Sequence, residues 1–230
     1  MRNRILVLLS VTLFILGISG CKNTEQTLPV SSAITLSPAP PSNSHMDAYK
    51  SVFQKKAKFF STDARKELDI SQLNHVVSSD NSVNAEISKF AVIDLDNDGT
   101  PEVVLSLTVN KNDYFGFEVF RYQDGVVYGY TLWYRSFMEL KDDGTFSYSG
   151  GAADHGFGTI MFTKDGYTIN EITYSESGIG TGNNETVSYF VNRESASQED
   201  FLSAVSKQDE KPGVIWYDFT DDNIETLLSD

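Results

Sequence analysis

The chain has 230 residues, of which 40% are hydrophobic and 12% aromatic, and this composition supports a packed core rather than disorder. Its 32 acidic and 18 basic residues give a formal charge of −14, so we exclude nucleic acid as a general partner because its phosphates would be repelled. A single Cys excludes an intramolecular disulfide framework and a zinc site made of thiolates alone.

The N-terminus has the layout of a secretory signal peptide. Two arginines precede an apolar stretch over 5–18, which is shorter than the ~20 residues that a membrane-spanning helix needs. The residues Ile-Ser-Gly-Cys over 18–21 resemble the lipobox of bacterial lipoproteins, in which the Cys is acylated and the peptide is cut just before it. We therefore expect residues 1–20 to be a lipoprotein signal peptide and Cys21 to anchor the protein to the extracytoplasmic face of the cell membrane. The alternatives are an ordinary cleaved signal and an uncleaved anchor.

The residues after the lipobox differ in character from the rest of the chain. Residues 21–44 are rich in Ser, Thr and Pro without sustained periodicity, which indicates a semi-extended tether carrying the acylated Cys21. Residues 45–230 are expected to form a single domain. Apolar residues at spacings of three and four predict an amphipathic helix over 46–60, and residues 61–88 are expected to hold one more short helix or irregular structure.

From residue 89 the pattern is typical of β-strands. Apolar, β-branched or aromatic runs predict strands at 90–93, 102–109, 115–122, 126–134 and 186–191. Hairpin turns are predicted at the Asp-Gly pairs 124–125, 143–144 and 165–166. Consecutive strands joined by tight turns indicate an antiparallel meander.

Helical signals return at the C-terminus. Ser197 and Thr220 are predicted N-caps of two helices, separated by a break at 211–213 and a short extended piece. The expected fold class is therefore α+β, with an antiparallel β-sheet meander flanked by N-terminal and C-terminal helices.

One loop has clear chemical content, the acidic stretch DLDNDGTPE over 94–102. Carboxylates stand at loop positions 1, 3, 5 and 9, with a glycine at position 6 that permits a sharp turn. Calcium prefers six to eight oxygen ligands in a flexible shell, and alternating Asp side chains can converge on one ion. We predict a structural Ca²⁺ site formed by the side chains of Asp94, Asp96, Asp98 and Glu102 and the carbonyl of Thr100.

The loop is not a complete EF-hand. Position 12 is Leu105 instead of a bidentate Glu, and a β-branched run follows where a helix should begin. The strand–loop–strand context resembles the calcium loops of integrin-type FG-GAP repeats, but a single such loop does not predict a propeller. The alternative is a plain acidic turn that binds no specific ion.

A wider resemblance follows from the order of these features. A lipobox, a tether, a helix beginning near 48–50 and the stretch FAVIDLDNDGTPEVVL over 90–105 resemble a group of secreted lipoproteins of Gram-positive bacteria. The segments over 120–127 and 218–228 are also similar to that group. The resemblance implies the fold and the location, and it implies no reaction.

The functional hypothesis that follows is a non-enzymatic, lipid-anchored surface protein that serves as a binding or scaffold module for an unknown extracellular ligand or protein partner. The alternative is a secreted hydrolase acting on cell-wall or polysaccharide material, or a carbohydrate-binding protein. A Ser/His/Asp hydrolase has weak support, because no G-x-S-x-G motif surrounds the candidates Ser147, Ser149, Asp154 and His155. A sugar-stacking platform could use Tyr128, Tyr130, Trp133 and Tyr134, although aromatic residues alternating on strands more often form core pairs.

Overall fold

The computed structural model describes residues 45–77, 83–180 and 184–229. The predicted signal peptide, Cys21 and the tether lie outside the described residues. Within the described part of the chain, no helix is both long and apolar enough to cross a membrane. The described residues belong to one compact unit, and the elements below lie within it.

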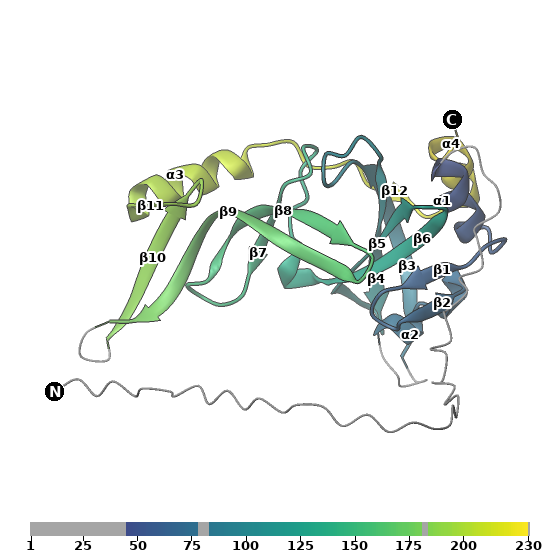
Figure 1. The fold of residues 1–230 in the computed structure, drawn as a ribbon, viewed down its shortest axis with the longest axis horizontal. Coiled ribbons are helices and arrows are strands. Elements are labelled where there is room, and N and C mark those ends of the chain that lie inside the picture. Colours follow the sequence, from purple (N-terminus) through teal and green to yellow (C-terminus); the bar gives the residue numbers. More distant parts are fainter. Residues whose placement is uncertain (1–44, 78–82, 181–183, 230) are drawn as a thin grey trace, which may run out of the picture. The chain divides into compact units, whose positions relative to one another are not determined.

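The described strands form two sheets (Figure 1). The first contains, in spatial order, β12 (Tyr217–Asp218), β3 (Ala85–Ile93), β4 (Glu102–Val109), β5 (Asn112–Gln123), β6 (Val126–Trp133), β1 (Phe59–Ser61) and β2 (Lys66–Leu68). The second contains β11 (Glu194–Ala196), β10 (Glu185–Val191), β9 (Gly166–Ile179), β8 (His155–Thr163) and β7 (Phe146–Ser149). Neighbouring strands are antiparallel in both sheets, apart from the parallel pair of β1 and β6.

Helices stand at both ends of the described chain, and one short 3₁₀ helix lies between β6 and β7. They are α1 (His45–Phe53), η1 (Ile70–Gln72), α2 (Asn74–Val77), η2 (Tyr134–Ser136), α3 (Gln198–Asp209) and α4 (Asp221–Leu227). The predicted caps are confirmed, since the hydroxyl of Ser197 accepts the N–H of Asp200 and that of Thr220 accepts the N–H of Asn223. The α+β fold class is confirmed.

The predicted helix over 46–60 is wrong beyond Phe53. Lys55 adopts a φ of 60°, a left-handed conformation that ends the helix. The chain then forms β1, where Phe60 pairs in parallel with Tyr128 of β6 and Phe59 is buried. Tertiary pairing and burial therefore override the helical periodicity of this segment. The short helix expected within 61–88 is present as η1 and α2.

The meander divides into two sheets instead of one. Strands β3 to β6 follow one another as antiparallel neighbours, and β7 to β11 repeat this pattern in the second sheet. The division falls after β6, where η2 and an irregular segment interrupt the ladder. The Asp-Gly turn at 124–125 is confirmed, because both residues have positive φ values (52° and 82°) between β5 and β6.

One core lies between the first sheet and the helices α1 and α4. Its aromatic centre is Phe120 of β5, whose ring lies 4.8 Å from that of Phe59 and 5.5 Å from that of Phe53. The hydroxyl of the fully buried Tyr49 in α1 donates to the carbonyl of Pro101 (3.1 Å) and accepts the N–H of Tyr122 (2.8 Å). Tyr49 thus ties α1 to the end of the acidic loop and to β5.

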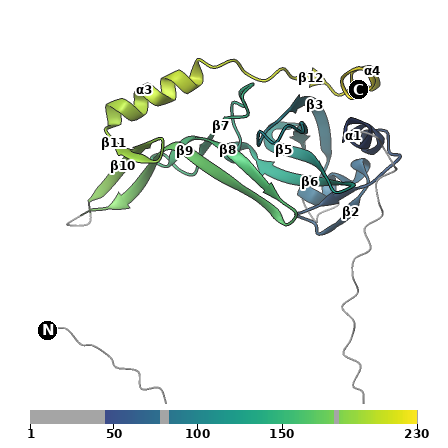
Figure 2. The same ribbon diagram turned by 45° about the horizontal axis from the view of Figure 1, so that its top comes forward.

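A second core covers the opposite face of the first sheet and joins it to the second sheet. Tyr130 of β6 and Phe146 of β7 are both fully buried in it, and the ring of Tyr130 lies 4.8 Å from that of Phe162 in β8. On the second sheet, Phe201 of α3 is buried against His155 and Tyr189. Figures 1 and 2 both show α3 running along this sheet.

Candidate functional site

The loop between β3 and β4 carries the predicted calcium ligands. Its ends are held together because Ile93 and Glu102 pair across the antiparallel hairpin. Asn97 and Gly99 have φ values of 57° and 87°, which turn the chain sharply. A Cβ at Gly99 would touch nothing within 4 Å, so glycine is favoured here by the backbone conformation and not by lack of space.

The carboxylate of Asp94 organises this turn from inside. Its Oδ1 accepts the backbone N–H of Asp98 at 3.1 Å, and its Oδ2 accepts that of Gly99 at 3.0 Å. Asp98 Oδ1 in turn accepts the N–H of Thr100 at 2.8 Å. A carboxylate oxygen keeps a second lone pair after accepting one such bond, so Asp94 can fold the loop and still coordinate a cation.

Three carboxylates gather at the base of the loop. Asp94, Asp96 and Glu102 each place an oxygen within 4.8 Å of the others. Glu102 is fully buried, and its Oε2 accepts the N–H of Leu95 at 2.9 Å. Among the described residues, neither Glu102 Oε1 nor the buried Asp96 Oδ1 has a hydrogen-bond partner. Buried polar oxygens without partners are costly, so the arrangement favours a cation between them.

The pKa of Glu102 is shifted by its burial among these carboxylates. Burial raises the pKa of Glu102 to about 8, with a further increase from the charge of Asp96, against the lowering effects of the Leu95 N–H and of Arg121. A divalent cation placed among these oxygens would favour the ionised carboxylate.

Arg121 of β5 supplies a positive charge to the same cluster. Its Nη1 forms an ion pair with Asp96 Oδ2, and its Nη2 lies 2.6 Å from Asp98 Oδ2. Nη1 is also 3.9 Å from Glu102 Oε1. Only 13% of the Arg121 side chain is exposed, and its guanidinium carbon lies 5.5 Å from the ring centroid of Phe162. A monovalent guanidinium cannot neutralise all the carboxylates that surround it.

The sequence reasoning did not identify Arg121. The relevant signal is strand register: Val103 of β4 pairs with Phe120 of β5, so the next residues outward, Glu102 and Arg121, lie across from each other. A basic residue facing an acid across two otherwise apolar strands is the pattern that could have revealed it.

The structure brings together part of the predicted ligand set. Asp94, Asp96 and Glu102 converge, whereas one oxygen of Asp98 faces Arg121 and the other accepts the Thr100 N–H. No contact bears on the predicted role of the Thr100 carbonyl, which stays a prediction.

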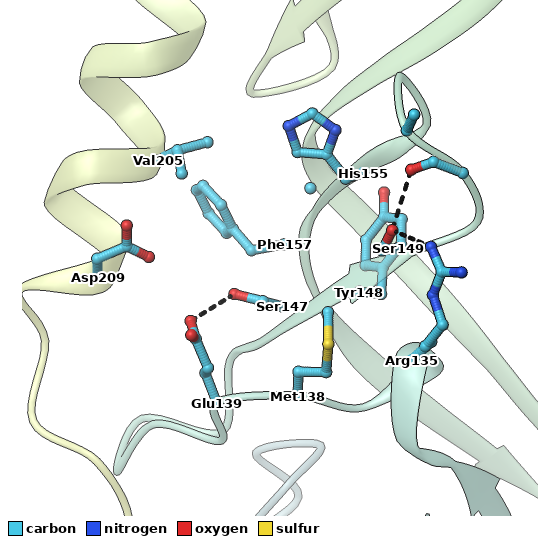
Figure 3. A pocket seen from close by; sticks show the side chains of 13 residues that line it. Arg135, Met138, Glu139, Ser147, Tyr148, Ser149, His155, Phe157, Val205 and Asp209 are labelled. Carbon is cyan, nitrogen blue, oxygen red and sulfur yellow. Dashed lines mark hydrogen bonds between the residues drawn. The ribbon is translucent and has the colours of Figure 1, made fainter. Parts of the chain in front are cut away.

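A separate cavity of about 480 Å³ lies where α3 passes over β7 and β8 (Figure 3). Phe157 and Val205 form an apolar wall, and Glu139, Asp209 and Arg135 approach from different sides. Within the described part of the chain, none of these three charged side chains forms an ion pair, and Arg135 Nη2 instead donates to Ser149 Oγ at 2.9 Å.

The backbone of Glu139 is unusual for a residue at this cavity. It has a φ of 51°, a left-handed conformation that costs free energy for a residue with a side chain. Its carboxylate accepts a long hydrogen bond of 3.4 Å from Ser147 Oγ. Glu139 was not identified as a functional candidate from the sequence, which offered no local motif around it.

The residues of the weak Ser/His/Asp hypothesis do not form a relay. Ser149 Oγ donates to the carbonyl of Gly151, and Asp154 accepts both the N–H and the hydroxyl of Ser177. The Nδ1 of His155 is 3.3 Å from the hydroxyl of Ser175, whose shortest contact is a 2.6 Å bond to the carbonyl of Ala153. This geometry does not support a nucleophilic serine at His155.

The suggested sugar-stacking platform is not formed. Tyr128 and Tyr130 are 5% and 0% exposed, because they pack into the second core, while Trp133 is 52% exposed. The tyrosines therefore do not share an open face with Trp133, and core packing was the correct interpretation for Tyr128 and Tyr130.

Comparisons of the chain with protein-family models, with curated proteins and with solved structures find no match.

Proposed function

We propose that this chain is a lipid-anchored protein of the extracytoplasmic membrane face whose acidic loop binds one structural Ca²⁺ ion. The lipobox ending at Cys21 supports the location. The calcium proposal is carried by one observation: the buried oxygens Glu102 Oε1 and Asp96 Oδ1 have no hydrogen-bond partner among the described residues, although they belong to a group of converging carboxylates.

The chemistry of the donor set fits a hard divalent cation. Asp94, Asp96 and Glu102 offer carboxylate oxygens, and calcium accepts such ligands together with backbone carbonyls and water. Asp98 and the Thr100 carbonyl would complete the protein's share of the shell. The ion would hold the ends of β3 and β4 together, next to the contact of Tyr49 with Pro101. Its role would therefore be to stabilise the surface module and not to perform chemistry.

Calcium is expected to stabilise the protein in a way that requires Asp96. An ion that binds only the folded chain stabilises it by RT ln(1 + [L]/Kd), and an extracellular module binds at about 10⁻⁴–10⁻³ M, so about 10 mM calcium should add roughly 1.4–2.7 kcal/mol. The measurement is thermal unfolding of the full chain, in a non-ionic detergent, with EGTA and with calcium. Asp96→Asn should abolish the calcium effect.

The matched control is Asp113→Asn, an exposed aspartate of β5 outside the cluster, which should keep the full calcium effect. A calcium effect that survives in Asp96→Asn would place the ion elsewhere, and no effect in the native chain would make the loop a plain acidic turn.

A second candidate function is carbohydrate binding or hydrolysis at the cavity beside α3. The observation that favours it is that two carboxylates, Glu139 and Asp209, line one cavity without ion partners among the described residues. Paired carboxylates across a sugar-binding cleft are the usual machinery of glycoside hydrolysis.

If the cavity hydrolyses glycosidic bonds, the protein should release reducing ends from a bacterial cell-wall polysaccharide preparation. Glu139→Gln and Asp209→Asn should each lower that rate by about 10²–10⁴-fold, while Glu194→Gln on the exposed edge strand β11 should not change it. Absence of release by the native protein would reject hydrolysis at this cavity.

A further inference from the structure

The guanidinium of Arg121 lies where a bound calcium ion would need its ligands. Arg121 pairs with Asp96 and Asp98 and approaches Glu102, and these are three of the four acids expected to coordinate the ion. The guanidinium of Arg121 therefore already neutralises part of the negative charge of the loop.

This internal cation leaves the site incompletely satisfied. Asp96 meets Arg121 through Oδ2 alone, so its Oδ1 has no hydrogen-bond partner in the described residues. Glu102 Oε1 is too far from Nη1, at 3.9 Å, for a hydrogen bond. Asp94 makes no ion pair with Arg121 and uses its oxygens to hold backbone N–H groups. The cluster therefore keeps buried acceptor capacity that a single guanidinium does not use.

Arg121 and calcium would use the carboxyl groups of the same two acids, Asp96 and Glu102, and would therefore lie close together. Calcium binds oxygen at 2.3–2.6 Å, so an ion on Asp96 and Glu102 would lie within a few ångströms of the guanidinium. Two positive charges at about 4 Å repel each other strongly in a partly buried site, where water screens them less than in bulk solution. This repulsion favours the displacement of one cation by the other.

We propose that Arg121 is an internal competitor for the calcium site, which holds the acidic loop folded without the ion and is displaced when calcium binds. This inference rests on the proposed calcium site. In this proposal Arg121 lowers the affinity of the loop for calcium. The ion has to replace existing ion pairs, so it binds more weakly than it would to the same carboxylates without Arg121.

Displacement of Arg121 would also affect a contact outside the loop. Its guanidinium carbon lies 5.5 Å from the ring of Phe162, which belongs to β8 of the second sheet and contacts Tyr130. A cation over an aromatic ring contributes an attraction that is lost when the cation leaves. Calcium binding at the first sheet would therefore change a contact with the second sheet.

The test is calcium titration calorimetry on the full chain in detergent, comparing the native protein with Arg121→Gln and Arg121→Lys. Arg121→Gln should bind calcium at least about tenfold more tightly than the native protein, because the competing charge is gone. In EGTA the same variant should unfold at a lower temperature, because the loop carboxylates then lack any counter-charge. Arg121→Lys keeps a positive charge and should stay closer to the native affinity.

The matched control is Arg65→Gln, which removes an exposed arginine paired with Asp165 and should leave the calcium affinity unchanged. If the native protein binds calcium and Arg121→Gln binds equally or more weakly, Arg121 is not a competitor and this inference fails alone. If neither protein binds calcium, the calcium site itself fails, and the inference fails with it. If Arg121→Gln folds only when calcium is added, the result supports replacement of one cation by the other.

Discussion

Replacing Glu118 by Gln is expected to make the protein more stable at pH 8 by roughly 4 kcal/mol and to leave it nearly unchanged near pH 4.5. Glu118 is fully buried on β5. Its Oε2 accepts the hydroxyl of Thr131 at 2.9 Å, and its Oε1 has no hydrogen-bond partner among the described residues. A Cβ at Gly129 would lie only 2.5 Å from Oε1, so the absence of a side chain at Gly129 makes room for this carboxyl group.

The pH dependence follows from the burial of this group. Burial raises the pKa of Glu118 to about 8, and the charge of Asp63 raises it further, while the bond from Thr131 lowers it. Between about pH 4.5 and pH 8 the unfolded chain has lost a proton that the folded chain retains. The free energy of unfolding therefore falls as the pH rises through this window and levels off above it.

Urea unfolding of the native protein and of Glu118→Gln at several pH values between 4.5 and 8.5 tests this expectation. The difference between the two curves isolates Glu118, because other groups such as Glu102 titrate in both proteins. Parallel curves would mean that the carboxyl group of Glu118 is solvated or paired and titrates as an ordinary glutamate.

Phe120→Ala is expected to lower the free energy of unfolding by about 3–5 kcal/mol. Phe120 is fully buried at the centre of the first core and meets the rings of Phe53 and Phe59 edge to face. Its truncation would leave a cavity beside the acidic cluster. Arg121 follows Phe120 on β5, and Glu102 precedes Val103, the residue of β4 that pairs with Phe120. The loss should be measured by urea unfolding in EGTA.

Met161→Ala is the control for this substitution, since Met161 is 57% exposed on β8 and its truncation should change stability by no more than about 0.5 kcal/mol. Phe120→Leu, which retains most of the apolar contact, should cost less than Phe120→Ala. Equal small losses in all three variants would contradict the packing of the first core.

Local chemistry in the sequence predicted the features that depend on a few neighbouring residues. The side chains of Ser197 and Thr220 cap their helices, and Asp124 and Gly125 form their hairpin turn, because each requires only a short-range hydrogen bond or a favoured φ value. The position of the acidic loop between two strands was predicted in the same way, whereas its binding of calcium stays a prediction.

Features that depend on distant segments could not be read from the same patterns. The segment around Phe59 looked helical by periodicity, but β6 offered it a parallel partner. The division into two sheets depends on how η2 interrupts the chain, which no turn motif marks. Arg121 and Glu118 acquire their roles from burial and from cross-strand neighbours, so their importance appears only when β4, β5 and β6 are aligned.

The most direct test of the calcium site is the anomalous difference map of a crystal of the protein grown with about 10 mM calcium, roughly ten times the weak end of the expected affinity range. We predict a calcium peak coordinated by Asp94, Asp96 and Glu102, with the guanidinium of Arg121 turned away from Asp96. A map without a peak in the loop, with Arg121 still paired to Asp96 and Asp98, would show that the guanidinium is the loop's permanent cation and would contradict the proposed calcium site.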